Sequence, residues 1–266
     1  MLKQLAKIIT SIALFITTLL TIPTFANANN DPKTKAYIAH INELGILDTT
    51  SDTLIGYIDL PNYIRKVDVS RDGKVAYALL AGENDSPIAI INTSRNRVPD
   101  NVNNLPNNQP NYRDTMAVSP DGKCAYTGEG AFYPDSDQID VIDASTNSFI
   151  GTVQGYPSNF HTSRIAFTPD SQKALVIGYH YSKTAYESTS LLFIDTNTNA
   201  VSETIELTAP DPEDIPSPSD IVISPDGKKA YVLYQYGEPL SVIDIATNKV
   251  TNTNMYGTGM VFFTTD

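Results

Sequence analysis

Two short sequence signatures alternate along this chain, and their recurrence limits the possible folds more than any other feature. The first signature is a turn resembling Pro-Asp-Gly between two apolar runs, and it occurs at 68–80, 117–129, 166–178 and 222–234. Its equivalent aspartates are 49, 49 and 56 residues apart, at Asp72, Asp121, Asp170 and Asp226. The second signature is an apolar run followed by a polar turn, at 45–54, 89–98, 140–149, 192–201 and 241–250. Periods of this size indicate a repeated supersecondary unit.

Both signatures contain the residues that tight turns between strands require. In "SPDGKKAY" at 224–231, Pro fixes φ, Asp accepts hydrogen bonds from the backbone that follows, and Gly adopts a positive φ. In the second signature, Asp ends the apolar strand and a Thr-Asn pair reverses the chain, as at 146–147, 198–199 and 247–248. One repeat therefore predicts four antiparallel strands, which is the blade of a β-propeller.

The two ends of the sequence carry the halves of one further repeat. "TKAYIAH" at 34–40 matches the strand after the Pro-Asp-Gly turn, and "GMVFFTTD" at 259–266 matches the strand before it. We expect Val261 to Thr264 to pair with Tyr37 to Ala39, which would hide the edges of an open sheet. The expected fold is all-β: a five-bladed β-propeller of four-stranded antiparallel blades, closed by the N- and C-terminal strands. The alternative is a fragment of a longer propeller.

The paired signatures "SPDGKKAYVLY" and "SVIDIATNKV" resemble the YVTN-type β-propeller repeat family of exported bacterial and archaeal proteins, over residues 34–266. No copy spells Tyr-Val-Thr-Asn, and the nearest is Tyr-Val-Leu-Tyr at 231–234. The resemblance implies an exported propeller, often periplasmic or on the cell surface. Related propellers include lactonases, a lyase of cyclic lactones and haem-binding domains, although most look like binding scaffolds. The fold alone does not choose among these functions.

The N-terminal residues predict export. Lys3 and Lys7 precede an apolar stretch at 8–25, which ends in the small-x-small pattern Ala-Asn-Ala. This pattern predicts a signal peptide over 1–28 and a propeller domain over 29–266, with an uncleaved anchor helix as the alternative. We expect a secreted or periplasmic protein that has no transmembrane segment after cleavage, with association with the cell surface as an alternative.

Charge and cysteine content narrow the expected partners and the source of stability. The net charge of −12 argues against nucleic acid, because nucleic acid affinity depends on Lys and Arg neutralising phosphates. The single cysteine, Cys124, permits no internal disulfide, so burial and strand pairing must stabilise the fold.

The two faces of such a ring differ. The tight turns lie on one face, the turn face; the longer variable loops lie on the other, the loop face. Aromatic and cationic residues gather in the loop-face segments: Tyr63, Tyr112, Arg113, Tyr133, His161, Arg164, His180 and Tyr181, with Phe160 and Tyr186. This composition is typical of recognition surfaces, so we expect a non-enzymatic scaffold that binds a protein or small ligand there. The alternative is that these rings only pack over the blade ends.

Other kinds of site have weaker support. His40, His161, His180 and Glu129 lack the short spacing of zinc ligands, so we expect no metal and no cofactor. No catalytic Ser-His-Asp set or carboxylate pair can be assembled, although a lactonase- or lyase-like site near the channel mouth is the alternative function. It would use His161, His180, Glu129 or Arg164. A purely structural surface protein is a third possibility.

Asp68 stands where the other copies have Ala, Val or Phe. Its carboxylate would either bind a cation or accept a hydrogen bond from the neighbouring blade.

Overall fold

The computed structural model describes residues 35–70, 73–81, 88–101, 113–129, 138–146, 148–181, 186–208, 215–235 and 238–256. All regular secondary structure in these ranges is β-strand, arranged in five antiparallel sheets. The predicted signal peptide at 1–28 and the predicted closing strand at 261–264 lie outside the described residues. No helix in the described part of the chain is long and apolar enough to cross a membrane.

Each sheet is built from consecutive strands. The first sheet contains three strands: β1 (Lys35–His40), β2 (Glu43–Asp48) and β3 (Thr53–Asp59). The second contains β4 (Ile64–Val69), β5 (Val75–Leu80), β6 (Ile88–Asn92) and β7 (Arg97–Asn101). The third contains β8 (Arg113–Val118), β9 (Cys124–Glu129), β10 (Ile139–Asp143) and β11 (Ser148–Thr152). The fourth contains β12 (Phe160–Phe167), β13 (Lys173–Tyr181), β14 (Tyr186–Asp195) and β15 (Ala200–Leu207). The fifth contains β16 (Pro218–Ile223), β17 (Lys229–Tyr234), β18 (Pro239–Asp244) and β19 (Lys249–Tyr256).

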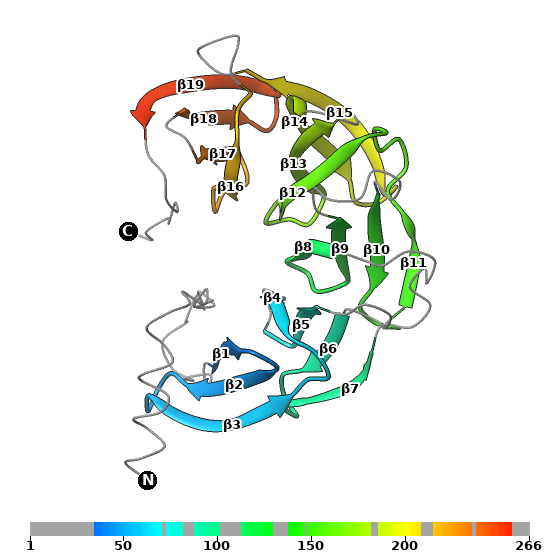
Figure 1. Ribbon diagram of the computed structural model, residues 1–266, viewed down its shortest axis with the longest axis vertical. Helices are drawn as coiled ribbons and strands as arrows, with labels where there is room; N and C mark the ends of the chain where they lie inside the picture. The colour runs from blue at the N-terminus through cyan, green and yellow to red at the C-terminus, as the bar shows by residue number, and fades with distance from the viewer. Residues whose placement is uncertain are drawn as a thin grey trace.

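The five sheets follow one another around an arc (Figure 1). The first strand of each four-stranded sheet, here called the inner strand, lies nearest the centre, and the last strand lies at the periphery (Figure 1). Neighbouring inner strands contact one another, β4 with β8, β8 with β12, and β12 with β16. This radial arrangement of four-stranded meanders is that of a β-propeller.

The Pro-Asp-Gly turns form as the sequence predicts. Gly73, Gly122 and Gly227 have φ values of +68°, +70° and +70°. The carboxylate of Asp226 accepts hydrogen bonds from the Ser224 hydroxyl at 2.6 Å and the Lys228 N–H at 3.1 Å. The carboxylates of Asp121 and Asp170 are held in the same way. These carboxylates therefore hold the connection between the first two strands of the third, fourth and fifth sheets.

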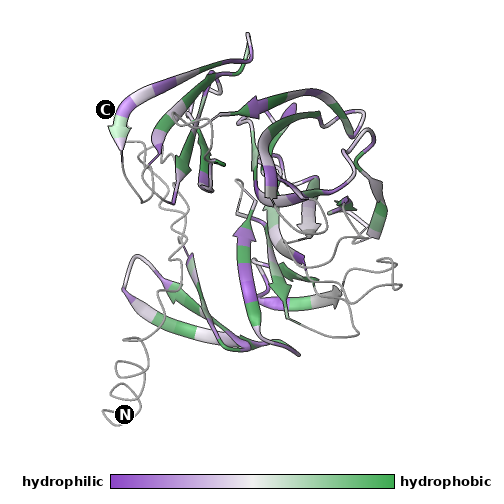
Figure 2. Ribbon diagram, turned by 45° about the horizontal axis from the view of Figure 1, so that its top comes forward, coloured by the Kyte–Doolittle hydropathy of each residue, from purple (hydrophilic) through white to green (hydrophobic). Residues whose placement is uncertain are grey.

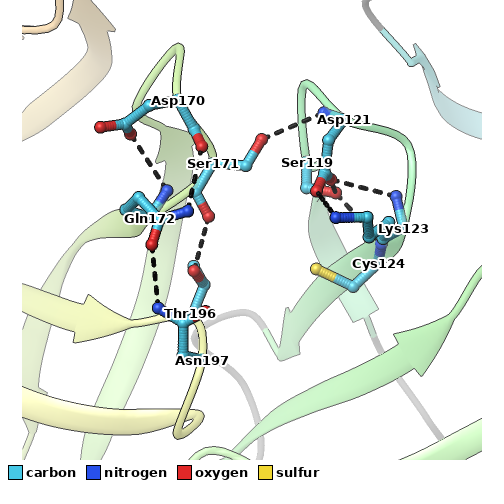
Figure 3. Close-up of polar contacts among 9 residues, drawn as sticks. All are labelled: Ser119, Asp121, Lys123, Cys124, Asp170, Ser171, Gln172, Thr196 and Asn197. Carbon is cyan, nitrogen blue, oxygen red and sulfur yellow. Dashed lines mark hydrogen bonds and ion pairs between the residues drawn. The ribbon is translucent and has the colours of Figure 1, made fainter.

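Ser171 occupies the position that glycine holds in the other turns and links two sheets. It has a positive φ of 61°, and its hydroxyl oxygen accepts the backbone N–H of Asp121 at 3.0 Å (Figure 3). The Ser171 carbonyl also accepts the hydroxyl of Thr196 at 2.5 Å (Figure 3). Ser171 thus adopts the backbone conformation that glycine has in the other turns. Its hydroxyl also forms a hydrogen bond between the third and fourth sheets.

The second turn of each repeat also follows the predicted chemistry. The side chains of Asp143, Asp195 and Asp244 each accept a backbone N–H from three residues further on, at 3.0, 3.1 and 3.0 Å. The asparagines that complete the described turns have φ values of +50°, +50° and +57°, at Asn96, Asn199 and Asn248. Asn tolerates this left-handed conformation better than most residues do, so it suits the reversal.

The core lies between successive sheets. Tyr37, Tyr77 and Tyr126 occupy equivalent positions on the second strand of a repeat, and each packs against the sheet that follows in the chain. Their exposures are 3%, 0% and 0%. Along several strands, hydrophobic residues alternate with hydrophilic ones (Figure 2). Stability therefore comes from four inter-sheet layers, with Cys124 present as a free thiol.

Candidate functional site

The inner strands position the candidate site. Each runs from the loop face to the turn face and contains a register shift near its beginning. The shifts lie between Ile64 and Lys66, Arg113 and Thr115, Thr162 and Arg164, and Pro218 and Asp220. A β-bulge inserts one extra residue and re-aims the side chains beside it. The residues that follow the four bulges, Lys66, Thr115, Arg164 and Asp220, therefore occupy equivalent positions.

These four residues lie on one side of their strands. The next residue in each strand, Val67, Met116, Ile165 or Ile221, packs against the preceding sheet. Because side chains alternate along a strand, Lys66, Arg164 and Asp220 are directed away from that layer, and so is Asp68. We call Lys66, Asp68, Arg164 and Asp220 the central charged set.

Electrostatic interactions connect this set across the arc. The pKa of Lys66 is lowered by burial; the nearby charge of Asp68 opposes the shift, Arg164 reinforces it and Asp220 opposes it. Arg164 lies on β12 and Asp220 on β16, two and three sheets away from Lys66 on β4. All three strands are inner strands, which lie nearest the centre of the arc (Figure 1).

Asp68 forms the hydrogen bond that the sequence allowed as one of its two roles. Its Oδ2 accepts the backbone N–H of Val118 on β8 at 2.8 Å, and its Oδ1 accepts the N–H of Val69 at 2.9 Å. Burial raises the pKa of Asp68, while Lys66 and these two hydrogen bonds oppose the shift. The carboxylate thus satisfies a backbone donor on the edge of the next inner strand.

The carboxylates and the cations of the set differ in their partners. Asp220 Oδ1 accepts the backbone N–H of Ile221 at 2.9 Å. Arg164 is exposed, and its Nη1 donates to the carbonyl of Ser163 at 2.8 Å. Lys66 is half-buried and forms no hydrogen bond or ion pair with any described residue. The acidic members are therefore held by backbone donors, whereas the cationic members keep donors available.

A group of rings lies at the loop-face end of the fourth sheet. Phe160 packs edge-on against His180, with ring centroids 5.1 Å apart, and His161 packs edge-on against Tyr181 at 5.4 Å. His180 Nε2 lies 3.2 Å from the hydroxyl of Ser190. Phe160 and His161 are buried, at 0% and 2% exposure, whereas His180 and Tyr181 are half-buried. Phe160 and His161 thus pack within the blade, and His180 and Tyr181 present part of their surface.

Arg113 lies inside the protein. Its exposure is 1%, its Nε donates to Asp140 Oδ2 at 3.0 Å, and its Nη2 donates to the same oxygen. Gln138 Nε2 donates to the other carboxylate oxygen at 3.1 Å. Burial raises the pKa of Asp140, and the Arg113 charge opposes this shift. The guanidinium therefore ties β8 to β10 below the loop face.

The remaining candidates are placed as follows. Tyr63 is 65% exposed immediately before β4. Tyr112 and Tyr133 lie outside the described residues, as do the side chains of Tyr186 and Glu129. His40 is exposed at the end of β1, in the first sheet, far along the chain from His161 and His180 on β12 and β13. Among the described residues, no three His, Cys, Asp or Glu side chains form a group able to hold a metal ion.

A hollow of about 410 Å³ lies on the turn face between the second and third sheets, lined by Lys74, Val75, Gly122, Lys123, Asp143, Ala144 and Ser145. Its acidic and cationic groups are already engaged locally. Asp143 accepts the Ser145 N–H at 2.7 Å, and Lys123 pairs with Asp121 at 3.0 Å. The loop face is therefore the stronger candidate.

The fold places this protein in the β-propeller class. No family model matches the sequence, and no curated protein matches it. Among solved structures, it is similar to hydrazine synthase of Kuenenia stuttgartiensis, with 17% identity and a TM-score of 0.64 over 86% of this chain and 68% of that one. It is also similar to the Cps50 (Swd1) β-propeller domain of Myceliophteria thermophila, with 11% identity and a TM-score of 0.62 over 87% and 66% of the two chains. It is similar to the Dos1 propeller as well, with 13% identity and a TM-score of 0.59 over 83% of this chain and 56% of that one. At these identities the similarity shows the fold alone.

Lys66 and Asp220 were not among the site residues predicted from the sequence. The sequence does contain a pattern that marks these positions. In each inner strand, the residue before the buried apolar position is polar: Lys, Thr, Arg or Asp. Recognising that signal requires the register of the inner strands, which the bulges shift.

Proposed function

We propose that this protein is an exported, non-enzymatic scaffold that binds a protein or small ligand on its loop face. The observation that carries the proposal is the central charged set, whose cationic members keep hydrogen-bond donors available, together with Tyr63, an exposed aromatic residue immediately before β4. Polar groups of this kind fix the orientation of ligands, and aromatic side chains contribute contact area.

The contacts of the imidazoles favour binding over catalysis. His180 lies within hydrogen-bond distance of Ser190, but Ser190 is 3% exposed and so is not accessible as a nucleophile. The hydroxyl is instead a buried partner that orients the imidazole. The lactonase- or lyase-like alternative therefore gains no support from this pair.

Export is part of the same proposal. The basic, apolar and small-residue segments of 1–28 support cleavage by a signal peptidase, leaving residues 29–266 in the periplasm or the medium. The acidic charge supports partners other than nucleic acid. Fractionation of the producing cell, with mass spectrometry of the mature N-terminus, tests this part, and a product that keeps residues 1–28 would refute it.

We further propose that the ring is a closed five-bladed propeller of the YVTN type. Tyr231 is equivalent to the buried tyrosines Tyr77 and Tyr126, yet it is half-buried on the last sheet. On the first sheet, Ile38 and Leu47 are half-buried, whereas the equivalent residues of the second sheet, Ala78 and Ile91, are fully buried. The two end sheets thus present the two complementary surfaces that form each inter-sheet layer, which supports closure through Val261 to Thr264.

The binding proposal is tested by screening the purified protein against small molecules and peptides for thermal stabilisation, and by isothermal titration of the hits. Tyr63→Ala and Arg164→Ala remove exposed loop-face groups, so they should weaken a genuine hit about tenfold or more. Lys228→Ala is the matched control, because this lysine is exposed on the turn face. Hits that respond equally to all three substitutions would refute the placement of the site.

A further inference from the structure

We propose that the carboxylate of Asp52 accepts hydrogen bonds from Lys229 and Tyr231 and so joins the first and fifth sheets of the closed ring. This inference rests on the proposed closure and adds the side chains that hold the closing layer together. Asp52 lies in the turn between β2 and β3, and Lys229 and Tyr231 lie on β17. The two sheets stand at the two ends of the arc (Figure 1).

Two of the described inter-sheet layers contain the contact from which the inference starts. Between the third and fourth sheets, the Tyr126 hydroxyl donates to Asn199 Oδ1 at 2.5 Å. Between the first and second sheets, Lys35 Nζ donates to Asn96 Oδ1 at 2.9 Å. Both asparagines have a φ of +50° and occupy the same position in the second turn of their repeat. In both layers, the second strand of a repeat therefore binds the turn of the sheet that follows.

A third layer shows the same turn position without a suitable donor. Between the fourth and fifth sheets, Leu175 stands at the tyrosine position, and Lys173 Nζ lies over the Phe193 ring, 5.9 Å from its centroid. The equivalent asparagine is Asn248, whose Oδ1 has no hydrogen-bond partner among the described residues. The remaining asparagine, Asn147, lies outside the described residues. In the three layers that can be compared, the acceptor is filled where the preceding sheet supplies a donor.

Asp52 occupies this turn position in the first sheet. It has a φ of +51°, like the asparagines, but it is the only acidic residue among the five copies. On the fifth sheet, Lys229 and Tyr231 occupy the positions of both donors. Where a single asparagine faces both kinds of donor, between the first and second sheets, the buried hydroxyl of Tyr37 has no partner among the described residues. A carboxylate has two acceptor oxygens instead of one, so an aspartate suits a position that faces two donors.

The surfaces around the proposed contact are complementary as well. The residues equivalent to Leu54 on the last strand of the other sheets pack in the layer shared with the preceding sheet: Val98, Phe149, Val201 and Val250. Leu54 itself is 44% exposed. Asp52 and Lys229 are both exposed and carry opposite charges. Closure would therefore cover Leu54 and bring the two opposite charges together.

Lys229 has another acidic residue beside it within its own sheet. Asp244 is its partner on β18, and the hydrogen bonds from Thr247, together with the charge of Lys229, lower the pKa of Asp244. Oδ1 of Asp244 already accepts the N–H and the hydroxyl of Thr247, at 3.0 and 2.9 Å. An ammonium has three donors, so Lys229 is able to serve the carboxylate of Asp52 too.

The test is a double-mutant cycle on the full mature chain, measured as the melting temperature. Asp52→Gly removes the carboxylate and tolerates the positive φ, so it should lower the melting temperature by about 2–4 °C. Lys229→Met and Tyr231→Phe should each lower it by no more than that. Combining either one with Asp52→Gly should lower it no further than Asp52→Gly alone. Losses that add in full for both pairs would overturn the proposal.

Three controls accompany the cycle. Asp52→Asn keeps one acceptor oxygen and should lose less than Asp52→Gly. Lys228→Met is the matched control, because Lys228 is exposed next to Lys229 and pairs with Asp226 at 3.7 Å. Its effect should add in full to that of Asp52→Gly, and coupling equal to that of Lys229 would overturn the proposal. Sedimentation should show a monomer; coupling confined to a dimer would place Asp52 against a second copy and overturn the contact within one chain.

Closure and this contact can fail separately. If deleting residues 257–266 lowers the melting temperature while the losses at Asp52 and Lys229 add in full, the ring closes without this contact and the inference is wrong. If the deletion has no effect and no coupling is found, closure itself is wrong.

Discussion

Asp68 on the second sheet accepts a hydrogen bond from the backbone N–H of Val118 on the third sheet, with 2.8 Å between Oδ2 and N. The contact joins two neighbouring inner strands at the centre of the ring, where the edge of β8 has no further strand beside it. Asp68 stands at a position that is apolar in the other repeats, and its side chain joins two neighbouring sheets of the propeller.

Removing this acceptor should destabilise the protein. Asp68→Ala leaves the Val118 N–H without its partner, which should lower the free energy of unfolding by about 1–3 kcal/mol. Asp68→Asn keeps a carbonyl oxygen and should lose less. Urea denaturation measures both, with Asp59→Ala as the control because Asp59 is exposed on β3. Equal stability of Asp68→Ala and the control would contradict the role assigned to this bond.

Gly178 on β13 should not tolerate a side chain. A Cβ there would lie 2.0 Å from the carbonyl oxygen of His161 and 2.8 Å from the Phe160 ring. Gly178→Ala should therefore destabilise the protein by about 3 kcal/mol or prevent folding, because backbone atoms cannot move aside easily. Gly56→Ala is the matched control, because a Cβ at Gly56 meets nothing within 4 Å. Thermal denaturation of the two variants checks the contrast, and similar melting temperatures would refute it.

The buried pair of Arg113 and Asp140 should be sensitive to single substitutions. Arg113→Met leaves the Asp140 carboxylate buried without its counter-ion, which should lower stability by about 3–5 kcal/mol. The double variant Arg113→Met with Asp140→Leu removes both charges and should recover much of that loss. Chemical denaturation of the single and double variants tests this coupling, and simple additivity of the two losses would show that the pair is not coupled.

Acidification should remove the contribution of the turn aspartates. The Thr168 hydroxyl and the Gln172 N–H hold the pKa of Asp170 below its usual value of 3.8. A carboxylate with a lowered folded-state pKa stabilises the protein above its unfolded pKa, and this stability is lost as the pH falls through the folded-state value. Asp170→Asn should therefore flatten the fall in melting temperature as the pH drops below about 4. If the melting temperatures of the variant and the native protein fall equally as the pH is lowered, Asp170 does not make this contribution.

Closure of the ring predicts the effect of a truncation. Deleting residues 257–266 removes the strand proposed to complete the first sheet, so the melting temperature should fall by about 4 °C or more. Replacing the exposed Met255 with Ala, without truncation, is the control. An unchanged melting temperature after truncation would count against closure.

The sequence predicted the repeat unit well because its turns depend on local chemistry. Asp226, Gly227 and Asn248 adopt the conformations expected of their residue types within a few residues of chain. The strand order within each repeat followed from these turns. The all-β propeller architecture is confirmed, and the predicted pairing of Val261 to Thr264 remains a prediction.

The candidate site was less predictable. Arg113 was expected on the loop face, but its partner Asp140 lies 27 residues away and draws it inside. His161 has the same polar character as His180, but only the fold places one under a neighbouring ring and leaves the other half-buried. Burial of this kind depends on side chains from other strands, which no local pattern specifies.

The sequence alone determined the turns, the strands between them and the period of the repeat, because each follows from the backbone preferences of neighbouring residues. Only the tertiary structure decided which charged residues lie on the inner strands, nearest the centre of the arc. Lys66, Arg164 and Asp220 come from three sheets, and one-residue bulges set the direction of each side chain. A side-chain period of two along a strand makes that single residue decisive, since it moves a charge from one side of the sheet to the other.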